Sequence, residues 1–427
     1  MRHSETKTVP VVATGHVPDA WLIIIARGLR SFGYGLLAVL LGVALSRAGF
    51  SPAAIGVLIT VSLVGDFCST YLIGLFADRW GRRRTLAVLA LLMAATGAVF
   101  GLTDIYLVLL VAAFFGTLGT SGSETAPFLP IEQAMLPQAT APERRTEIFA
   151  RYNLVATFAA AGGALVAGLP DLLVRTGVPL STGVRLMFGL YTAVALVVVL
   201  FVLRLSPLVE PRVMAQRSAT SRWQRLVPPI GRSRGIILRL SALFGVDSFA
   251  GGLTVQSLMA LFFHLRFGVP LGPLAALFFG ANTLSALSFL AAAPLARRIG
   301  LLNTMVFTHL PSNVLLALVA VMPTFPLAAV VLLARQMLSQ MDVPTRQAYT
   351  MALVAPEERT AAASVTSLAR SAGSATSPLF GGLLLQGSLL ALGLPFVVAG
   401  AIKAAYDLTL WAVFRRVASA EGQEPRA

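Results

Sequence analysis

The sequence predicts an all-α polytopic membrane protein with about twelve transmembrane helices in two pseudo-symmetric bundles of six. Two observations carry this prediction. Of the 427 residues, 56% are hydrophobic and only 12% are charged, whereas a soluble globular domain carries about 25% charged residues. Apolar runs of membrane length also recur along the whole chain, and about 30–35 residues per helix and loop leave room for about twelve spans.

The first bundle is expected over residues 21–204, after a polar tail at residues 1–20. The tail lacks the cleavage pattern of a secretory signal, so we expect it to stay in the cytoplasm. Glycine, proline and arginine divide the bundle into six spans. They are expected at about 21–45, at 52–73, at 85–102, from 105 into the proline-rich 123–137, at 148–169, and from about 184 to 203.

The second bundle is expected over residues 235–414, between a polar linker at 205–234 and a tail at 415–427. The linker is rich in arginine, serine and proline, which is typical of a flexible cytoplasmic connection. The remaining spans are expected at about 235–262, 271–294, 304–322, 327–351, 361–386 and 391–414. Both tails and the linker would then lie on the cytoplasmic side.

The net charge of +15 follows from this topology. Arginines gather in the loops assigned to one side, and arginine next to a span is retained in the cytoplasm. These side chains can also meet anionic lipid headgroups. No nucleic-acid-binding motif accompanies them, so nucleic acid is not an expected partner. The single cysteine, Cys68, cannot form an intramolecular disulfide.

The loop between the second and third spans, GLFADRWGRRR at 74–84, organises the chain. One acid and several arginines between two membrane-length runs indicate a cytoplasmic hairpin. The core of the loop, ADRWG at 77–81, returns as ARRIG at 296–300, an offset of 300 − 81 = 219. APERRT at 141–146 likewise returns as APEERT at 355–360, an offset of 356 − 142 = 214. The two bundles are therefore parallel repeats.

With this loop signature (glycine, three residues, Asp-Arg, any residue, Gly-Arg-Arg) and this repeat, the chain resembles the major facilitator superfamily over nearly its whole length. The resemblance implies a transporter that alternates access to a central cavity, similar to the drug–proton antiporters that export solutes. It also implies that Asp78 lies near the start of the eleventh helix and helps to lock the inner side closed, where a helix N-terminus favours a carboxylate. Because Arg297 replaces this aspartate in the second copy, only the first loop should form the lock.

The residues expected to form this conformational latch share the signature loop, its second copy and the loops beside them. They are Gly74, Asp78, Arg79, Gly81, Arg82, Arg83, Arg145, Arg297, Arg298 and Arg359. Glu132 and Arg346 occupy equivalent positions near the inner membrane face, and we expect them to be latch partners as well.

Polar side chains inside the spans are the candidate site residues, because an ionisable group in a membrane is costly unless it is paired or hydrated. Spacings of three and four residues place them on shared helix faces. The residues expected to line a substrate and proton cavity are Arg27, Arg30, Tyr34, Asp66, Glu124, Asp247, Thr254, Arg335, Asp342 and Arg370.

Asp247 is the sharpest candidate, with Arg30 as its expected partner across the two halves. One hypothesis is that this pair separates as the halves move, so that Asp247 binds and releases a proton. The alternative is a static ion pair, and it applies equally to Asp66 and Glu124. Two further residues near the end of the chain, Lys403 and Asp407, are four apart in one helix, which predicts a local pair.

His309 is expected to be a packing residue rather than a proton carrier. Drug exporters of the superfamily usually carry an arginine early in the fourth helix, and 106–123 contains none. Their glycine–proline pattern of the fifth helix lies here at 373–382, in the eleventh. Both departures weaken the antiporter assignment.

The function expected first is secondary active transport of a small organic solute, with proton-coupled efflux as its form. Proton-coupled uptake of an anionic metabolite is the alternative, because Arg30, Arg335 and Arg370 would suit a carboxylate or a phosphate. A non-transporting membrane sensor is the alternative from another class. No nucleotide-binding loop, metalloprotease motif or nucleophile elbow is present, so neither an enzyme nor a cofactor or metal is expected. The expected state is a monomer in the plasma membrane, in a bacterium the inner membrane.

Overall fold

The computed structural model describes residues 17–120, 127–140, 144–210, 231, 233–355, 358–387 and 391–416. The regular elements of this part of the chain are helices. Those of the first half are α1 (Val17–Arg47), α2 (Pro52–Trp80), α3 (Arg82–Leu102), α4 (Tyr106–Phe115), α5 (Phe128–Met135), α6 (Arg145–Val166), α7 (Leu169–Arg175), α8 (Leu180–Leu203) and the short η2 (Pro207–Val209). Those of the second half are α10 (Arg234–Gly252), α11 (Gln256–Phe267), α12 (Leu271–Ile299), α13 (Leu301–Val321), α14 (Phe325–Gln336), α15 (Asp342–Leu353), α16 (Arg359–Leu384), η4 (Ala391–Gly393) and α17 (Leu394–Phe414).

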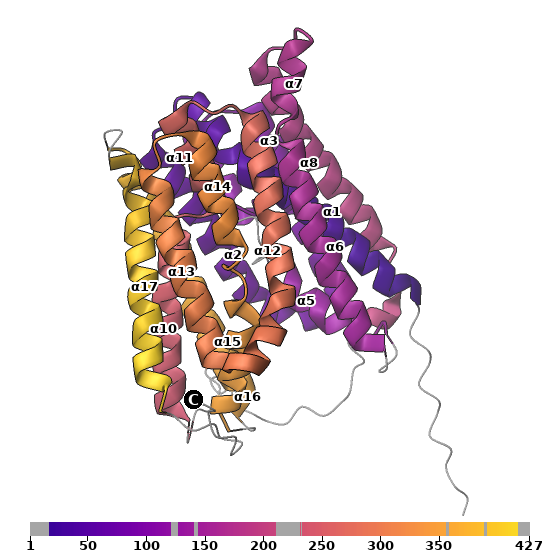
Figure 1. Cartoon of the computed structure of the whole chain (residues 1–427). Coiled ribbons are helices and arrows are strands. Elements are labelled where there is room, and N and C mark those ends of the chain that lie inside the picture. Colours follow the sequence, from indigo (N-terminus) through magenta and orange to yellow (C-terminus); the bar gives the residue numbers. More distant parts are fainter. Residues whose placement is uncertain are drawn as a thin grey trace, which may run out of the picture.

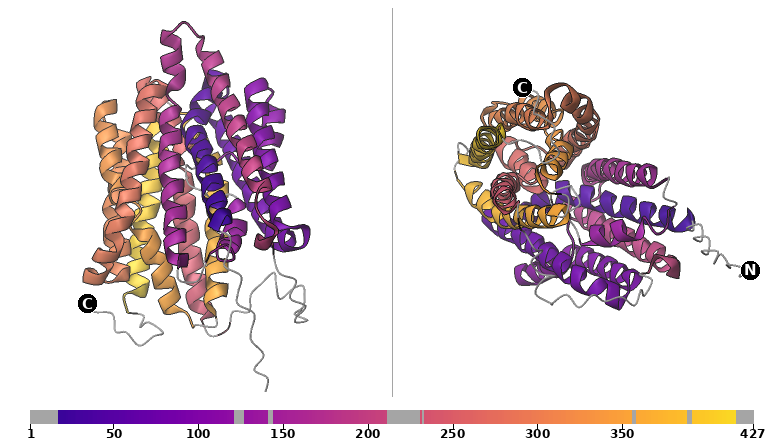
Figure 2. Two further views of the ribbon diagram at one scale, coloured as in Figure 1. Left: turned by 90° about the vertical axis from the view of Figure 1, so that its right-hand side faces the viewer. Right: turned by 90° about the horizontal axis from the view of Figure 1, so that it is seen from below.

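The helices run roughly parallel to one long axis and form two bundles (Figure 1). Seen from below, the helices of the first half gather on one side and the orange and yellow helices of the second half on the other (Figure 2). The short α7 projects beyond the upper end of the molecule, and α17 ends at the lower end. The predicted arrangement of two six-helix halves is confirmed.

Within the described residues, nine helical stretches are long and apolar enough to cross a membrane. The fourth and tenth expected spans are each divided, into α4 and α5 and into α14 and α15, and the eleventh, α16, carries many serines, threonines and alanines. Large apolar side chains on the outside, such as Leu102 at 82% and Leu290 at 74% exposed, would be costly in water. In a bilayer they meet acyl chains instead.

The breaks in the helices place polar side chains in the middle of the molecule. The seventh span, expected as one helix, ends as α10 at Gly252 and resumes as α11 at Gln256. After α4 the chain turns at Gly119, whose φ is +59°. A Cβ at this position would lie 2.3 Å from the ring of Tyr34. Only glycine combines this backbone with such a close approach to α1.

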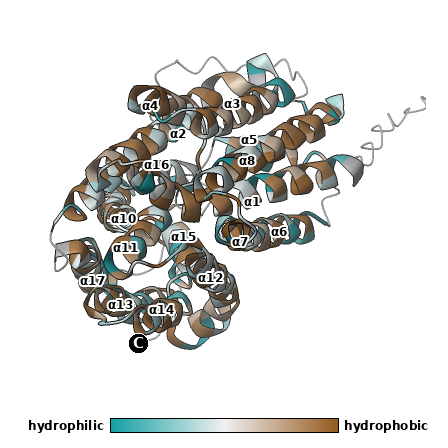
Figure 3. Cartoon of the chain, turned by 90° about the horizontal axis from the view of Figure 1, so that it is seen from above, coloured by the Kyte–Doolittle hydropathy of each residue, from teal (hydrophilic) through white to brown (hydrophobic). Residues whose placement is uncertain are grey.

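The two halves meet mainly along three pairs of helices, α2 with α16, α6 with α12, and α1 with α11. The first two pairs can be followed in the view from above (Figure 3). Hydrogen bonds cross the boundary at each pair or beside it. The Leu379 amide donates to Thr60 Oγ1 at 2.8 Å, the Gly272 amide to Asp171 Oδ2 at 2.6 Å, and Ser257 Oγ to the Thr120 carbonyl at 3.0 Å. Close helix approach without bulky side chains is evident where Gly56 faces Gly382.

Candidate functional site

A buried ion cluster lies inside the first half, between α1, α5 and α6. The Arg30 guanidinium donates two parallel hydrogen bonds to Glu132, Nη1 to Oε1 and Nη2 to Oε2, both at 2.8 Å. Tyr152 Oη donates to Glu132 Oε2 at 2.8 Å, and Arg27 Nη1 donates to Tyr152 Oη at 2.6 Å. The Arg30 guanidinium also lies 4.1 Å from the ring centre of Phe128. A forked pair of this geometry is the strongest arrangement open to an arginine and a carboxylate.

Beside this cluster, Tyr34 Oη donates to Thr117 Oγ1 at 3.0 Å, and Tyr191 donates to the Thr117 carbonyl. These bonds join α1 and α8 to the segment that follows α4. Asp66 in α2 is buried, and its Oδ1 has no hydrogen-bond partner among the described residues. A buried carboxylate oxygen without a partner is costly, so Asp66 stays a candidate proton or solute group.

The second half holds a larger cluster, centred on Asp247 of α10. Lys403 Nζ from α17 donates to Asp247 Oδ1 at 2.6 Å. Two arginines face the other oxygen, Oδ2: Arg346 Nη1 from α15 at 3.5 Å and Arg370 Nη1 from α16 at 3.8 Å. His309 Nε2 from α13 lies 3.9 Å from Oδ1. One buried carboxylate is therefore shared by side chains from four helices.

Further charges surround this centre. Asp342, at the start of α15, accepts from Arg346 Nη1 at 2.8 Å, so Arg346 has two carboxylate partners. Arg335 Nη1 donates to the neighbouring Gln336 at 2.7 Å, but its Nε has no partner among the described residues. Nη1 of Arg370 likewise has no hydrogen-bond partner among the described residues, although it forms the 3.8 Å ion pair with Asp247, and its side chain is 36% exposed. The cluster therefore contains guanidinium N–H groups that have no hydrogen-bond acceptor among the described residues.

On the far side of His309, a second carboxylate completes the network. His309 Nδ1 lies 2.9 Å from Asp407 Oδ1, and Asn313 Nδ2 donates to Asp407 Oδ2 at 2.8 Å. His309, Asn313 and Asp407 are all buried. A continuous chain of polar contacts thus runs from Asp407 through His309 to Asp247.

The ends of the signature loop are held by the linker. The Glu210 carboxylate accepts from the amides of Arg82 at 2.7 Å and Arg83 at 3.0 Å, the first residues of α3. A carboxylate at a helix N-terminus satisfies free amides and the helix dipole together. Gly81, with φ at +102°, makes the turn from α2 to α3.

The other latch candidates lie at the lower helix ends. Arg145 Nη2 donates to the Pro137 carbonyl at 3.4 Å, and Arg359 Nε to the Met351 carbonyl at 3.1 Å. Arg79, Arg297 and Arg298 are exposed. Glu124 lies outside the described residues, as do the surroundings of Gly74 and of the Asp78 side chain.

Three expectations about partners are wrong. Arg30 pairs with Glu132 and Asp247 with Lys403, so the expected Arg30–Asp247 pair does not form. Glu132 and Arg346 lie in separate buried clusters rather than forming a latch. Lys403 of α17 binds Asp247 of the neighbouring helix α10, because its long side chain reaches that helix. It does not pair with Asp407, which lies one turn away on α17. His309 packs against Tyr406 and also contacts Asp407 within the polar network.

Thr254 is buried as expected, but it follows the end of α10. Helical spacing within α10 therefore does not relate Thr254 to the face that carries Asp247. Several partners were not among the expected site residues: Tyr152, Lys403, His309, Asn313, Asp407 and Glu210. For the buried ones, the available signal was a polar side chain inside an apolar span.

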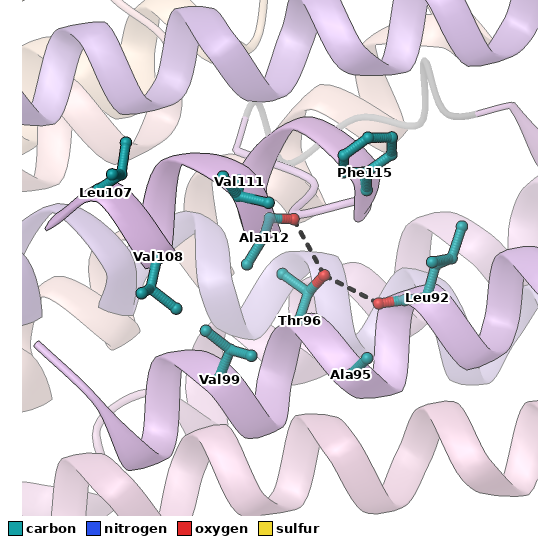
Figure 4. Close-up of a pocket in the computed structure, with 9 residues that line it drawn as sticks. All are labelled: Leu92, Ala95, Thr96, Val99, Leu107, Val108, Val111, Ala112 and Phe115. Atoms are coloured by element: carbon teal, nitrogen blue, oxygen red, sulfur yellow. Dashed lines mark hydrogen bonds between the residues drawn. The ribbon is translucent and has the colours of Figure 1, made fainter. Parts of the chain in front are cut away.

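A separate groove of about 480 Å³ lies between α3 and α4 on the outside of the first bundle. Leu92, Val99, Leu107, Val111 and Phe115 are among its lining residues, and Thr96 Oγ1 closes its floor by donating to the carbonyls of Leu92 and Ala112 (Figure 4). Its lining is almost wholly apolar and faces outward, which suits acyl chains and not a polar solute. Among the described residues, no three His, Cys, Asp or Glu side chains converge as a metal site requires.

The sequence profile of the Major Facilitator Superfamily matches residues 23–339. The chain belongs to this superfamily. It is thus a membrane transporter rather than an enzyme, and its buried clusters lie inside the two halves of a transporter fold.

Comparison with individual superfamily proteins and related chains agrees with this assignment. The chain is 27% identical over 412 residues to the uncharacterized membrane protein YJR124C of Saccharomyces cerevisiae, with 90% of this chain and 92% of the yeast protein covered. The crystal structure of the nucleoside transporter NupG is similar with a TM-score of 0.70 at 16% identity, covering 93% of this chain and 99% of that one. That of a D-xylose–proton symporter is similar with a TM-score of 0.71 at 14% identity, covering 95% and 99%. At such identities the solved structures show the shared fold alone.

Proposed function

We propose that this transporter moves a small organic solute between its two halves by alternating access, and that the movement is coupled to protons. The observation that carries the proposal is the shared carboxylate of Asp247, with contacts between 2.6 and 3.9 Å to Lys403, Arg346, Arg370 and His309. A carboxylate with several competing partners can exchange them as helices shift. Each arrangement then prefers a different protonation state, which links proton binding to conformation.

The direction we propose is efflux, with protons moving in exchange. The resemblance of the chain to drug–proton antiporters supports this direction. A proton-coupled neighbour in structure, the D-xylose–proton symporter, supports coupling to protons in general and leaves the direction to experiment.

Uptake of an anionic metabolite is the second candidate, and the two arginines with unused donors favour an anion. Arg335 Nε and Arg370 Nη1 are buried atoms without a hydrogen-bond partner among the described residues. Asp247 and Asp342 act electrostatically on both. Leaving such donors unpaired is costly, and a carboxylate or phosphate would satisfy them in a planar, forked contact.

Transport by purified protein in liposomes tests both candidates. A panel of labelled carboxylates, phosphates, neutral sugars and organic cations is supplied with and without a pH gradient. The proposal expects at least one solute to accumulate against its gradient only when the pH gradient is present. A non-transporting sensor would move none of them.

For an anionic solute, Arg335→Gln and Arg370→Gln should each raise the half-saturation concentration at least tenfold, which corresponds to about 1.4 kcal/mol of lost binding. Arg266→Gln is the matched control, because Arg266 lies at the end of α11 and donates to the Met322 carbonyl at 3.4 Å. Equal effects of all three substitutions would argue against an anion site at Arg335 and Arg370.

We further propose that the chain works as a monomer in the plasma membrane, with both tails and the linker at 205–234 in the cytoplasm. The arginine-rich loops support this orientation. The yeast relative shows that similar chains occur in a eukaryote, so a bacterial inner membrane is one setting among others. A Ser218→Cys variant should react with impermeant thiol reagents only in opened cells. Reaction in intact cells would reverse the orientation.

A further inference from the structure

His309 lies between two carboxylates that come from different helices. Its Nδ1 is 2.9 Å from Asp407 Oδ1 and 3.1 Å from Oδ2, on α17. Its Nε2 faces Asp247 Oδ1 on α10 at 3.9 Å. The side chain is buried and its ring packs edge-on against Tyr406, with centroids 6.2 Å apart. The imidazole is therefore the link between the two carboxylates.

The geometry decides which ring nitrogen carries the proton in the neutral form. An ionised carboxylate only accepts hydrogen bonds. Next to an ionised Asp407, an unprotonated Nδ1 would set its lone pair against a carboxylate oxygen at 2.9 Å, so this contact favours the tautomer with the proton on Nδ1, a nitrogen that also lies 3.2 Å from Asn313 Nδ2. Asn313 Nδ2 donates to Asp407 Oδ2 at 2.8 Å and holds this carboxylate in place. Nε2 is then the basic nitrogen, and it points toward Asp247.

The charged groups around His309 come from every helix that builds the cluster. Besides Asp247 and Asp407, α17 contributes Lys403 and Tyr406. On α15 stand Asp342 and Arg346, on α16 Arg370, and on α14 Arg335. The arginines of α12, Arg297 and Arg298, lie in its last turn. Histidine is the side chain whose ordinary charge change falls between about pH 5 and 8, and it is the one group here with a basic nitrogen aimed at a carboxylate.

We propose that His309 is the proton-binding residue of the second half, with Asp407 and Asn313 as positioning residues. A proton from water adds to the lone pair of Nε2, and no bond of the protein breaks. The resulting imidazolium donates its new N–H to Asp247 Oδ1 and keeps its Nδ1–H on Asp407. The ring is thereby held between two carboxylates that both stabilise its charge.

Protonation of His309 changes which cations can pair with the Asp247 carboxylate. Lys403 and Arg346 approach this carboxylate at 2.6 and 3.5 Å, and Arg370 at 3.8 Å. The imidazolium is a further cation competing for the same two oxygens. Arg370 is the most distant of the three and the most exposed, so it is the one released. The proton at His309 thus frees a guanidinium for solute. This consequence, unlike proton binding itself, rests on the proposed function.

Nuclear magnetic resonance of the histidine ring tests proton binding without any solute. The chain has four histidines, so His3→Gln, His16→Gln and His264→Gln together leave His309 as the single reporter. In labelled protein held in lipid nanodiscs, its ring signals should change as protons bind when the pH is lowered. Asp407→Asn in this background should weaken proton binding about tenfold or more. Asp171→Asn, which removes a carboxylate on α7, should leave the titration unchanged.

Ring signals that stay constant from about pH 5 to 9 would overturn the proposal, as would a titration that Asp407→Asn and Asp171→Asn alter equally. The result is separable from that of the transport assay. If His309 titrates as expected but no solute moves with a pH gradient, proton binding stands and coupled transport fails. If solute accumulates in response to the gradient with His309→Gln protein as well as with the native chain, the protein transports but His309 does not carry its proton.

Discussion

The two halves place charges of opposite sign at one pair of corresponding positions, Glu132 and Arg346. In the first half, Arg30 of α1 pairs with Glu132 of α5, and in the second, Asp247 of α10 faces Arg346 of α15. Glu132 and Arg346 are related by 346 − 132 = 214, the offset of the APERRT repeat. The first pair is forked, with both bonds at 2.8 Å and side chains 0% and 2% exposed. The second carboxylate is shared with Lys403 and Arg370 as well.

This difference distinguishes a static ion pair from a cluster whose pairing can change. We call the Arg30–Glu132 pair the clamp, and Asp247 with its cationic partners the switch. In a forked pair with matched charges, each partner binds the other through two hydrogen bonds. Separating such a buried pair would leave both charges uncompensated, so the pair keeps one arrangement. The cluster around Asp247 has more cations than one carboxylate can satisfy, and it includes a histidine. We infer that the first half provides a rigid wall and that proton-linked change occurs in the second.

The largest expected effect is at the clamp. Glu132→Gln removes the charge that pairs with Arg30 and should cost about 3–5 kcal/mol of stability, because breaking a buried pair leaves the other charge uncompensated. Thermal or denaturant unfolding of purified protein in detergent measures the loss. The double variant Arg30→Met with Glu132→Leu should recover most of it. A single variant as stable as the native chain would mean that the pair is not a clamp.

A smaller loss is expected from the corresponding change in the second half. Lys403→Met removes the 2.6 Å bond to Asp247 but keeps the length of the side chain. Asp247 retains Arg346 and Arg370, so the cost should be about 1.5–3 kcal/mol, that of one hydrogen bond to a charged group. The same unfolding measurement compares the two variants. If Lys403→Met costs more than Glu132→Gln, the assignment of clamp and switch is reversed.

The helices and the two-bundle fold could be predicted because long apolar runs have few alternatives. The third span, expected at 85–102, is observed as Arg82–Leu102, and the ninth, expected at 304–322, as Leu301–Val321. The break after Gly252 was missed. Apolar residues continue on both sides of it, so hydropathy gives no boundary there.

The two halves should respond alike at their matching loop glycines. Gly81 and Gly300 end α2 and α12 with φ at +102° and +84°, a region that side chains with a Cβ avoid. Gly81→Ala and Gly300→Ala should each cost about 1–2 kcal/mol. Unfolding measurements on both variants test this. A clear difference between them would mean that the loops are not structurally equivalent.

The smallest effect on stability is expected at Asp78. Asp78→Asn should leave expression intact and slow transport, since the helix-terminus interaction expected for this carboxylate is worth about 0.3–2 kcal/mol and can shift a balanced equilibrium several-fold. Transport rates in liposomes measure the effect. Arg297→Gln, at the matching position of the second copy, is the control and should transport normally. A native transport rate in Asp78→Asn protein would contradict a latch role for Asp78.

For the site, the sequence identified charged residues but assigned some of them the wrong partners. Spacing along one helix shows which side chains share a face, and a repeat offset shows which positions are equivalent in the two halves. Neither shows which helices are neighbours in space. Lys403 was paired with Asp407 by spacing, yet its side chain reaches α10, and Asp407 binds His309 of α13. Partner choice depends on packing between helices, which a single sequence does not encode locally.

The most direct test is accumulation driven by a pH gradient in liposomes with Asp247→Asn protein. The amide keeps the shape of the carboxylate but carries no negative charge to attract the cations or to stabilise an imidazolium at His309. The account predicts that the variant still exchanges solute across the membrane at equilibrium but no longer accumulates it. A well-folded Asp247→Asn protein that concentrates solute as the native chain does would contradict it.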